Sequence, residues 1–233
     1  MGVQGLRKFI EGQSCTSNVA PDANASADHV MFDTNSLVHR AYSKEHTTPQ
    51  QTIDVVVERA TVLLTQTVKP KISATFAFDG PAPIAKLNTQ RLRRRKVQAM
   101  DVANNNFFSD LSITAGSSFM VQLENELARA MTKLFYGTGI KLFFFGSTVI
   151  GEGEFKISQA LSGLSRRKGA SVNETCVIIG NDIDLTLTCF GATCFHNLSV
   201  LGPVNGQLFD ISMILQRWIA TAGTGFVSSL WSM

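Results

Sequence analysis

The chain has 233 residues, of which 44% are hydrophobic and 17% are charged, and its formal net charge is +3. This size and composition allow a sizeable buried core and predict one α/β domain. The small net charge excludes a protein that is basic throughout. Its cations are instead concentrated in residues 86–96 and 166–168. The four cysteines are too scattered for a disulfide framework, and no apolar run is long enough to cross a membrane.

The first part of the chain reads as a polar loop followed by a strand, a helix and a second strand. Residues 12–28, GQSCTSNVAPDANASAD, are small and polar and predict a loop. HVMFD then ends at Asp33 and ISATFAFD ends at Asp79, and both are rich in residues typical of a strand buried on both faces. Residues 52–66 between them have apolar side chains near helical spacing.

The second part repeats this alternation. A stretch from residue 101, DVANNNFFSDLSITAGSS, is irregular, and residues 118–135 predict a helix that ends before Gly137. The apolar run IKLFFF predicts a third strand, residues 154–164 a helix, and TCVIIG a fourth strand. The tail ATAGTGFVSSLWSM offers no clear element. Strands that alternate with helices predict a mostly parallel central sheet with helices on both faces.

Acidic residues stand at or just after the end of each predicted strand. In a parallel sheet these ends meet at one edge, where ligands bind. The sequence therefore predicts that one rim of the sheet carries Asp33, Asp79, Glu152, Glu154, Asp182 and Asp184.

Converging carboxylates repel one another unless a cation neutralises them. Ligands that are all oxygen favour Mg²⁺ or Mn²⁺ over zinc. Two such ions can activate a water molecule and stabilise the leaving oxygen in the cleavage of a phosphodiester. These residues therefore predict a metal-dependent nuclease.

A block of cations follows Asp79 in the segment DGPAPIAKLNTQRLRRRK. If residues 84–96 are helical, Lys86, Gln90, Arg93 and Arg94 form one stripe, and guanidinium groups bind phosphate oxygens through two donors at once. The stripe is interpreted as a clamp for a substrate phosphate beside the metals. Plainer interpretations stay open for each feature alone, since charge runs often form solvated helix faces, and single acids often cap helices. His39 alone also fits an ordinary buried or capping histidine.

Several motifs in this order resemble the N-terminal nuclease domain of the XRN-type 5′→3′ exoribonucleases. The motifs are DGPAPIAKLNTQRLRRRK, FDTNSLVH at 32–39, ITAGSSFM at 113–120, GEGEFKI at 151–157 and GNDIDL at 180–185. The opening MGVQGL resembles flap endonucleases and XPG-type nucleases equally well. The resemblance implies one nuclease domain over residues 1–233, with a core like that of the PIN and flap endonucleases.

The resemblance also implies roles for individual residues. The six rim carboxylates would bind two Mg²⁺ or Mn²⁺ ions, and Lys86, Gln90, Arg93 and Arg94 would bind a 5′-monophosphate. Asn35 and His39 would lie near the scissile nucleotide, with His39 stacked on the first base. The implied reaction is the stepwise hydrolysis of single-stranded RNA to nucleoside monophosphates, in the nucleus or cytoplasm and away from membranes.

The chain departs from the family pattern at Ala115, Ile150, Phe155 and Asn181. It also stops where the family continues into a second conserved region, which supplies a further acid and an aromatic residue. An alternative function is therefore a truncated or weakly active relative that binds RNA or a ribonucleoprotein partner structurally. A flap endonuclease is the third possibility, disfavoured because no helical arch is evident in the sequence.

Overall fold

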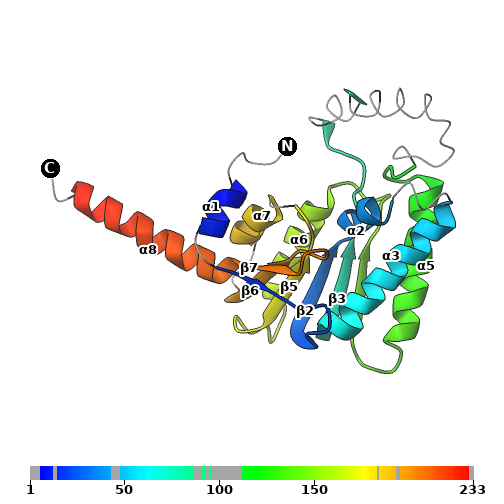
Figure 1. The fold of residues 1–233 in the computed structure, drawn as a ribbon, viewed down its shortest axis with the longest axis horizontal. Coiled ribbons are helices and arrows are strands. Elements are labelled where there is room, and N and C mark those ends of the chain that lie inside the picture. Colours follow the sequence, from blue (N-terminus) through cyan, green and yellow to red (C-terminus); the bar gives the residue numbers. More distant parts are fainter. Residues whose placement is uncertain are drawn as a thin grey trace.

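The structure is a computed structural model of the 233-residue chain. It describes residues 6–12, 15–42, 48–84, 86, 91–92, 95, 112–182, 184–192 and 195–230. Of these, residues 6, 7, 9, 184, 190, 192 and 221–230 are described by their backbone alone. Element labels follow Figure 1.

A seven-stranded sheet forms the centre of the molecule, in the order β1-β7-β6-β5-β2-β3-β4 (Figure 1). The pairs from β6 through β5, β2 and β3 to β4 are parallel, whereas β7 pairs antiparallel with both β6 and β1. The prediction of a mostly parallel sheet is confirmed. The strands are β1 Thr16–Asn18, β2 Ala25–Asp33, β3 Val68–Ala77, β4 Lys141–Phe145, β5 Thr175–Ile179, β6 Asn197–Leu201 and β7 Gln207–Asp210.

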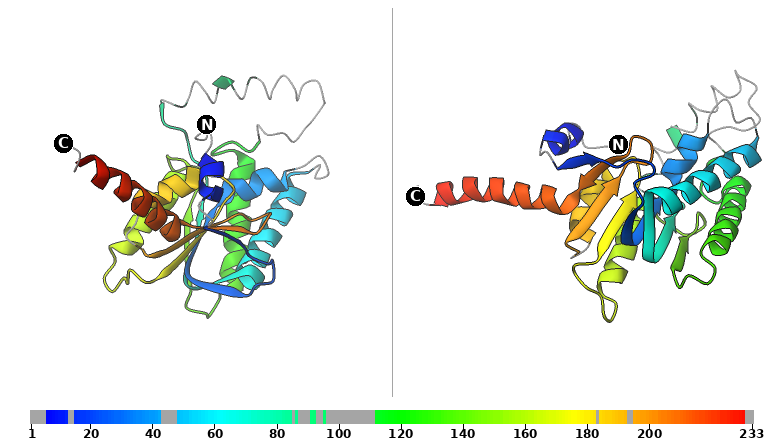
Figure 2. Two further views of the ribbon diagram at one scale, coloured as in Figure 1. Left: turned by 60° about the vertical axis from the view of Figure 1, so that its left-hand side comes forward. Right: turned by 60° about the horizontal axis from the view of Figure 1, so that its bottom comes forward.

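Helices cover both faces of the sheet, as predicted (Figures 1 and 2). One apolar core lies between the sheet and α2, α3 and α5, and a second lies on the face that α6, α7 and the start of α8 cover. The helices are α1 Leu6–Gly12, α2 Thr34–Ala41, α3 Pro49–Val62, α5 Ser118–Leu134, α6 Gly153–Ser165, α7 Asp184–Ala192 and α8 Ile211–Leu230, and a π-helical turn, η1 Leu63–Thr67, follows α3.

The sequence explains where the long helices begin. Thr48 and Gln51 form a capping box at the start of α3, with Pro49 at the first helical position. The side chain of Ser117 caps α5 by accepting from the N–H of Met120 at 3.2 Å. The predicted helices over 52–66, 118–135 and 154–164 are thus confirmed, with slightly shifted ends.

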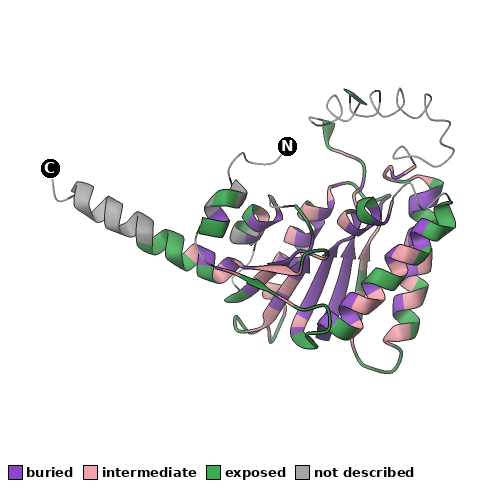
Figure 3. Cartoon of the chain, viewed as in Figure 1, coloured by how far each residue is buried: buried purple, intermediate pink, exposed green. Residues whose placement is uncertain are grey.

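The centre of the sheet is almost fully buried (Figure 3). The rings of Phe32, Phe76 and Phe144 stack across β2, β3 and β4, with centroids 4.9 and 5.1 Å apart. Such stacking adds to the hydrophobic stabilisation of the three strands. It helps to hold together three of the four strands whose carboxyl ends lead to the predicted acids.

The prediction of a loop over residues 12–28 is wrong in part, and the tail has a helix that the sequence did not indicate. Within the predicted loop 12–28, residues 16–18 form β1 and β2 begins at Ala25. Small polar residues tolerate an edge strand, and among the described strands β1 pairs with β7 alone. The tail, in which the sequence offered no clear element, belongs largely to α8, which runs from Ile211 to Leu230 and extends away from the sheet in Figure 1. No helix in the described part of the chain is long and apolar enough to cross a bilayer.

Candidate active site

The four strands that carry the predicted acids end at one edge of the sheet. β4, β3, β2 and β5 are neighbours and parallel, so their carboxyl ends lie side by side (Figure 1). Asp33 is the last residue of β2, Asp79 follows β3 by two residues, and Asp182 follows β5 by three. Glu152 comes after the turn that follows β4 and directly precedes α6. We call this group of side chains the acidic cluster: Asp33, Asp79, Glu152, Glu154 and Asp182.

Two glycines make room for Asp33 inside the acidic cluster. A Cβ on Gly153 would lie 3.0 Å from Oδ1 of Asp33 and 3.3 Å from Oδ1 of Asp79, so both carboxylates face the first turn of α6. A Cβ on Gly180 would lie 3.3 Å from the Cβ of Asp33. The glycines of the GEGE and GND motifs therefore allow the close approach of three chain segments.

Asp79 is held by hydrogen bonds from two other segments. Its Oδ1 accepts from the N–H of Gly153 at 2.6 Å, and its own N–H donates to Oδ1 of Asn35 at 3.0 Å. Asn35, predicted to lie near the nucleotide, is buried and thus joins the start of α2 to the end of β3. Burial raises the pKa of Asp79, while the Gly153 hydrogen bond lowers it.

Asp33 is the carboxyl group most strongly affected by its surroundings. Burial, and then the charges of Asp79, Glu154 and Asp182, raise its pKa from 3.8 to about 8. Without a bound cation, Asp33 is therefore protonated at neutral pH. The acidic cluster accommodates positive charge in the form of either a proton or another cation.

We expect the stability of the metal-free protein to fall as pH rises from about 4 to about 8. In this range the folded state keeps a proton on Asp33 that the unfolded state releases, so deprotonation favours unfolding. Urea unfolding in EDTA at several pH values would measure the trend, with Asp33→Asn as the control. The difference between the two proteins should widen with pH, and parallel profiles would contradict the assignment.

A lysine from the basic segment reaches the acidic cluster. Nζ of Lys86 lies 2.6 Å from Oε2 of Glu152, and this ion pair raises the pKa of the lysine. The lysine side chain is 59% exposed, so the pair contributes little to stability. The contact places a predicted phosphate ligand beside a predicted metal ligand.

The structure describes only part of the predicted phosphate clamp. Residues 84, 86, 91, 92 and 95 are helical, while Gln90, Arg93 and Arg94 lie outside the described residues. Asp184 begins α7, but its side chain is likewise outside the described set. His39 is exposed near the end of α2 and contributes to lowering the pKa of Asp79.

Sequence reasoning missed Lys156, which lies beneath the acidic cluster. Its side chain is 1% exposed, and Nζ donates to the carbonyl oxygens of Phe78 at 2.6 Å and Gly146 at 2.9 Å. Burial lowers its pKa, while the carboxylates of Asp79 and Glu124 act in the opposite direction. A detectable signal was the position of Lys156 three residues after Gly153, which places both on the buried side of α6.

The acidic cluster offers only oxygen ligands, which suit Mg²⁺ or Mn²⁺ better than zinc. In the described part of the chain, no three acidic, histidine or cysteine side chains are arranged as a ready metal site. The residues nevertheless fit a hard cation, because the carboxylates of Asp33 and Asp79 both face the first turn of α6 and the charges of Asp79, Glu154 and Asp182 raise the pKa of Asp33.

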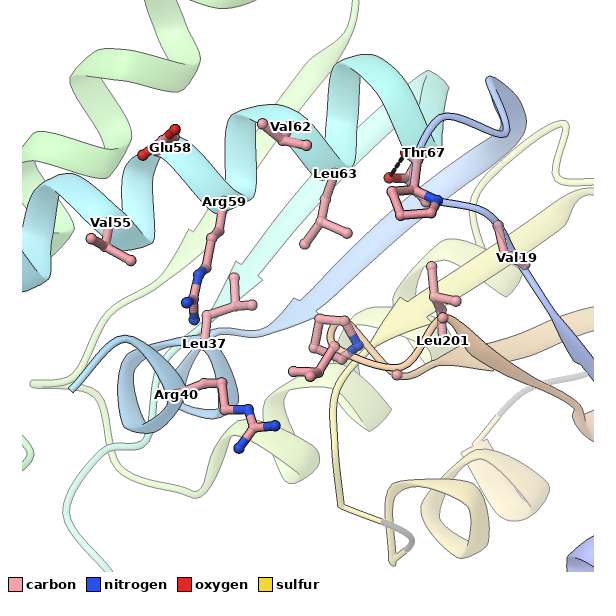
Figure 4. A pocket seen from close by; sticks show the side chains of 15 residues that line it. Val19, Leu37, Arg40, Val55, Glu58, Arg59, Val62, Leu63, Thr67 and Leu201 are labelled. Atoms are coloured by element: carbon pink, nitrogen blue, oxygen red, sulfur yellow. Dashed lines mark hydrogen bonds between the residues drawn. The ribbon is translucent and has the colours of Figure 1, made fainter. Parts of the chain in front are cut away.

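A separate hollow of about 810 Å³ lies between α2, α3 and the turn after β6 (Figure 4). Its walls are mainly aliphatic, including Leu37, Val55 and Leu201, and the side chains of Arg40 and Arg59 reach toward it. None of the predicted site residues that the structure describes lines this hollow. The candidate active site is therefore at the sheet edge and separate from this hollow.

Comparison with known proteins gives a match to a family over most of the chain. Residues 1–201 match the family described as XRN 5′-3′ exonuclease N-terminus. The 5′-3′ exoribonuclease 1 of Saccharomyces cerevisiae is 30% identical over 183 residues, covering 69% of this chain and 12% of the yeast protein. The 5′-3′ exoribonuclease 2 of Candida glabrata is 28% identical over 212 residues, covering 77% of this chain and 21% of that protein.

A solved structure has the same fold. The catalytic core of Rad2 in complex with DNA substrate superposes with a TM-score of 0.52 at 17% identity, covering 92% of this chain and 57% of the Rad2 chain. The chain thus spans about an eighth to a fifth of the length of these two exoribonucleases.

Proposed function

Because the chain belongs to the XRN 5′-3′ exonuclease N-terminus family, we propose that it is the nuclease core of a metal-dependent 5′→3′ exoribonuclease. Its substrate would be single-stranded RNA with a 5′-monophosphate, and its products nucleoside monophosphates, formed in the nucleus or cytoplasm. The observation that best supports this proposal is the meeting of the buried Asp33 and Asp79 with the Lys86–Glu152 pair at one sheet edge.

In this proposal the acidic cluster, together with Asp184, holds one or two Mg²⁺ or Mn²⁺ ions. Bound ions of this kind supply an activated water and stabilise the leaving oxygen. Lys86 would bind the terminal phosphate with Gln90, Arg93 and Arg94, which selects RNA that has a charged 5′ end. His39 would stack on the first base, a contact that tolerates any sequence.

The ion pair of Lys86 with Glu152 suggests how the two parts of this site cooperate. A cation bound at Glu152 would compete with Lys86 for the carboxylate, which leaves the ammonium free to bind a phosphate. The 5′-phosphate and the metal would then favour each other's binding, because such coupling is reciprocal.

The test is degradation of 5′-monophosphate, single-stranded RNA labelled at its 3′ end. We expect processive loss of the substrate in Mg²⁺, none in EDTA, and much slower loss of RNA with a 5′-hydroxyl. The Asp182→Ala variant should be inactive, while Asp22→Ala, a change at an exposed residue outside the acidic cluster, should retain activity. Cleavage that persists in EDTA or in Asp182→Ala would overturn the proposal.

Binding without turnover would favour the alternative function. In that case the protein would hold RNA with a preference for a 5′-phosphate, or a ribonucleoprotein partner, through the same basic segment. Titration of 5′-phosphate and 5′-hydroxyl RNA by fluorescence anisotropy separates these outcomes, since only phosphate recognition distinguishes the two RNAs.

The Gly153→Ala variant should lose Mn²⁺ affinity without losing its fold. The added Cβ would meet the Asp33 and Asp79 oxygens at 3.0 and 3.3 Å, so both carboxylates must move. Changes that misplace metal ligands typically cost roughly 10- to 100-fold in affinity. Calorimetric titration with Mn²⁺ would measure the effect.

Gly163→Ala is the matched control, because it lies in the same helix and its added Cβ would meet nothing within 4 Å. Both changes favour the helical conformation. Equal Mn²⁺ affinity of the two variants would contradict the placement of Asp33 and Asp79 around the metal.

A further inference from the structure

Lys156 is the only lysine or arginine among the described residues that is fully buried. Burying an ammonium group is costly unless hydrogen bonds and opposite charges compensate it. Here two carbonyl oxygens accept from Nζ, and the carboxylates of Asp79 and Glu124 lie near enough to influence it. An apolar side chain of similar length would fill the space without burying a charge, but it would leave both carbonyls without a donor, so the role of Lys156 lies in what its ammonium binds.

The ammonium joins two strands just beyond their last shared hydrogen bond. β3 and β4 pair up to Ala77 and Phe145, and the N–H of Phe78 donates to the carbonyl of Phe145 at 2.9 Å. The next carbonyls, those of Phe78 and Gly146, both accept from Lys156. The Lys156 ammonium therefore takes the place of the next hydrogen bonds between the strands, at the point where the two backbones separate.

The two segments that leave this point carry part of the acidic cluster, namely Asp79 on one and Glu152 and Glu154 on the other. The β3 segment leads at once to Asp79, and the β4 segment leads through residues 146–151 to Glu152. Beyond Lys156 they contact each other again, since the N–H of Gly80 donates to the carbonyl of Gly151 at 2.8 Å. The N–H of Gly151 in turn donates to the carbonyl of Pro81 at 3.3 Å.

We propose that Lys156 is a positioning residue that sets the spacing of Asp79 from Glu152 and Glu154 by clamping the ends of β3 and β4. The clamp itself is independent of catalysis, while its consequence for metal binding rests on the proposed function. Lys156 lies beneath the acidic cluster and acts through the two backbone segments.

The first test is amide hydrogen exchange of the metal-free protein under native conditions. In Lys156→Met, two buried carbonyls lose their donor, at a cost of about 1–3 kcal/mol each, so local opening should increase. We expect the amides of Gly80, Gly151 and Gly153 to exchange at least roughly tenfold faster, while amides of β2 and β5 remain protected. Lys168→Met, which removes an exposed lysine beyond the end of α6, is the matched control.

Unchanged exchange at these three glycines, or a uniform increase throughout the protein, would overturn the proposal. If Lys156→Met does not fold, the same question is tested on the wild-type protein by NMR. We expect the ammonium protons of Lys156 to exchange slowly with solvent, and rapid exchange would contradict the clamp. Neither measurement needs nuclease activity, so a failure of the proposed function leaves them valid.

Mn²⁺ affinity supplies a second readout with an informative sign. Removing a nearby positive charge should by itself strengthen cation binding. Loss of positioning should weaken it instead, by roughly 10- to 100-fold as for other residues behind metal ligands. Tighter binding in Lys156→Met than in Lys168→Met would show that Lys156 acts only through its charge and would refute the positioning role.

Discussion

Replacing Asp33 by asparagine should abolish RNA cleavage while leaving the metal-free fold intact. Asp33 is buried at the end of β2, and its pKa of about 8 means that the neutral carboxylic acid predominates near pH 7 without a cation. An amide has nearly the same size and is also neutral. We therefore expect the free energy of unfolding in EDTA at pH 7 to rise, because the unfolded wild-type chain gains by releasing the Asp33 proton, whereas asparagine has no proton to release.

Activity should change in the opposite direction and fall sharply. A bound metal ion contributes several kcal/mol of transition-state stabilisation, and each 1.36 kcal/mol changes the rate about tenfold. Loss of a central ligand should thus lower the cleavage rate by roughly 10³-fold or more. Initial rates on 5′-monophosphate RNA in Mg²⁺ would measure this, with Asp22→Asn as an exposed control. A variant that retains a tenth of wild-type activity would show that Asp33 is not a metal ligand.

Much of this site could be predicted because strand ends are easy to locate. HVMFD, ISATFAFD and TCVIIG are buried nearly throughout, and a parallel sheet places the residues after them at one edge. The proximity of Asp33, Asp79 and Asp182 could thus be predicted without knowing how the intervening loops fold. The starts of α3 and α5 were equally predictable, because each depends only on contacts between neighbouring residues. The side chains of Thr48 and Ser117 accept from backbone N–H groups in the first turn of their own helix.

Contacts between distant segments were beyond the sequence patterns. The pairing of β1 with β7 joins residues 16–18 to residues 207–209, and nothing in the polar loop indicates a partner so far away. Lys156 was overlooked because a lysine usually marks an exposed position, whereas here the carbonyls of two separate strands bind it. Asn35 was assigned to the nucleotide, yet its hydrogen bond with Asp79 depends on the alignment of β2 with β3.

The Gly80→Ala variant should be destabilised more than any other glycine-to-alanine change near the site. A Cβ at this position would lie 1.6 Å from the carbonyl oxygen of Val149, which is backbone and cannot turn aside as a side chain could. Either residues 79–81 or the turn after β4 must move. Overpacking of this kind typically costs about 1–3 kcal/mol, and more where backbone must shift.

The same shift should separate Asp79 from Glu152, so cleavage should fall even at temperatures where Gly80→Ala remains folded. Urea unfolding and cleavage rates would be compared with Gly163→Ala, whose added methyl group meets nothing. Because Lys156 lies 3.0 Å from the same Cβ position, the effects of Gly80→Ala and Lys156→Met on stability should be less than additive. Full additivity would mean that Gly80 and Lys156 stabilise the protein independently. The close contact between residues 79–81 and the turn after β4 would then not depend on the buried ammonium.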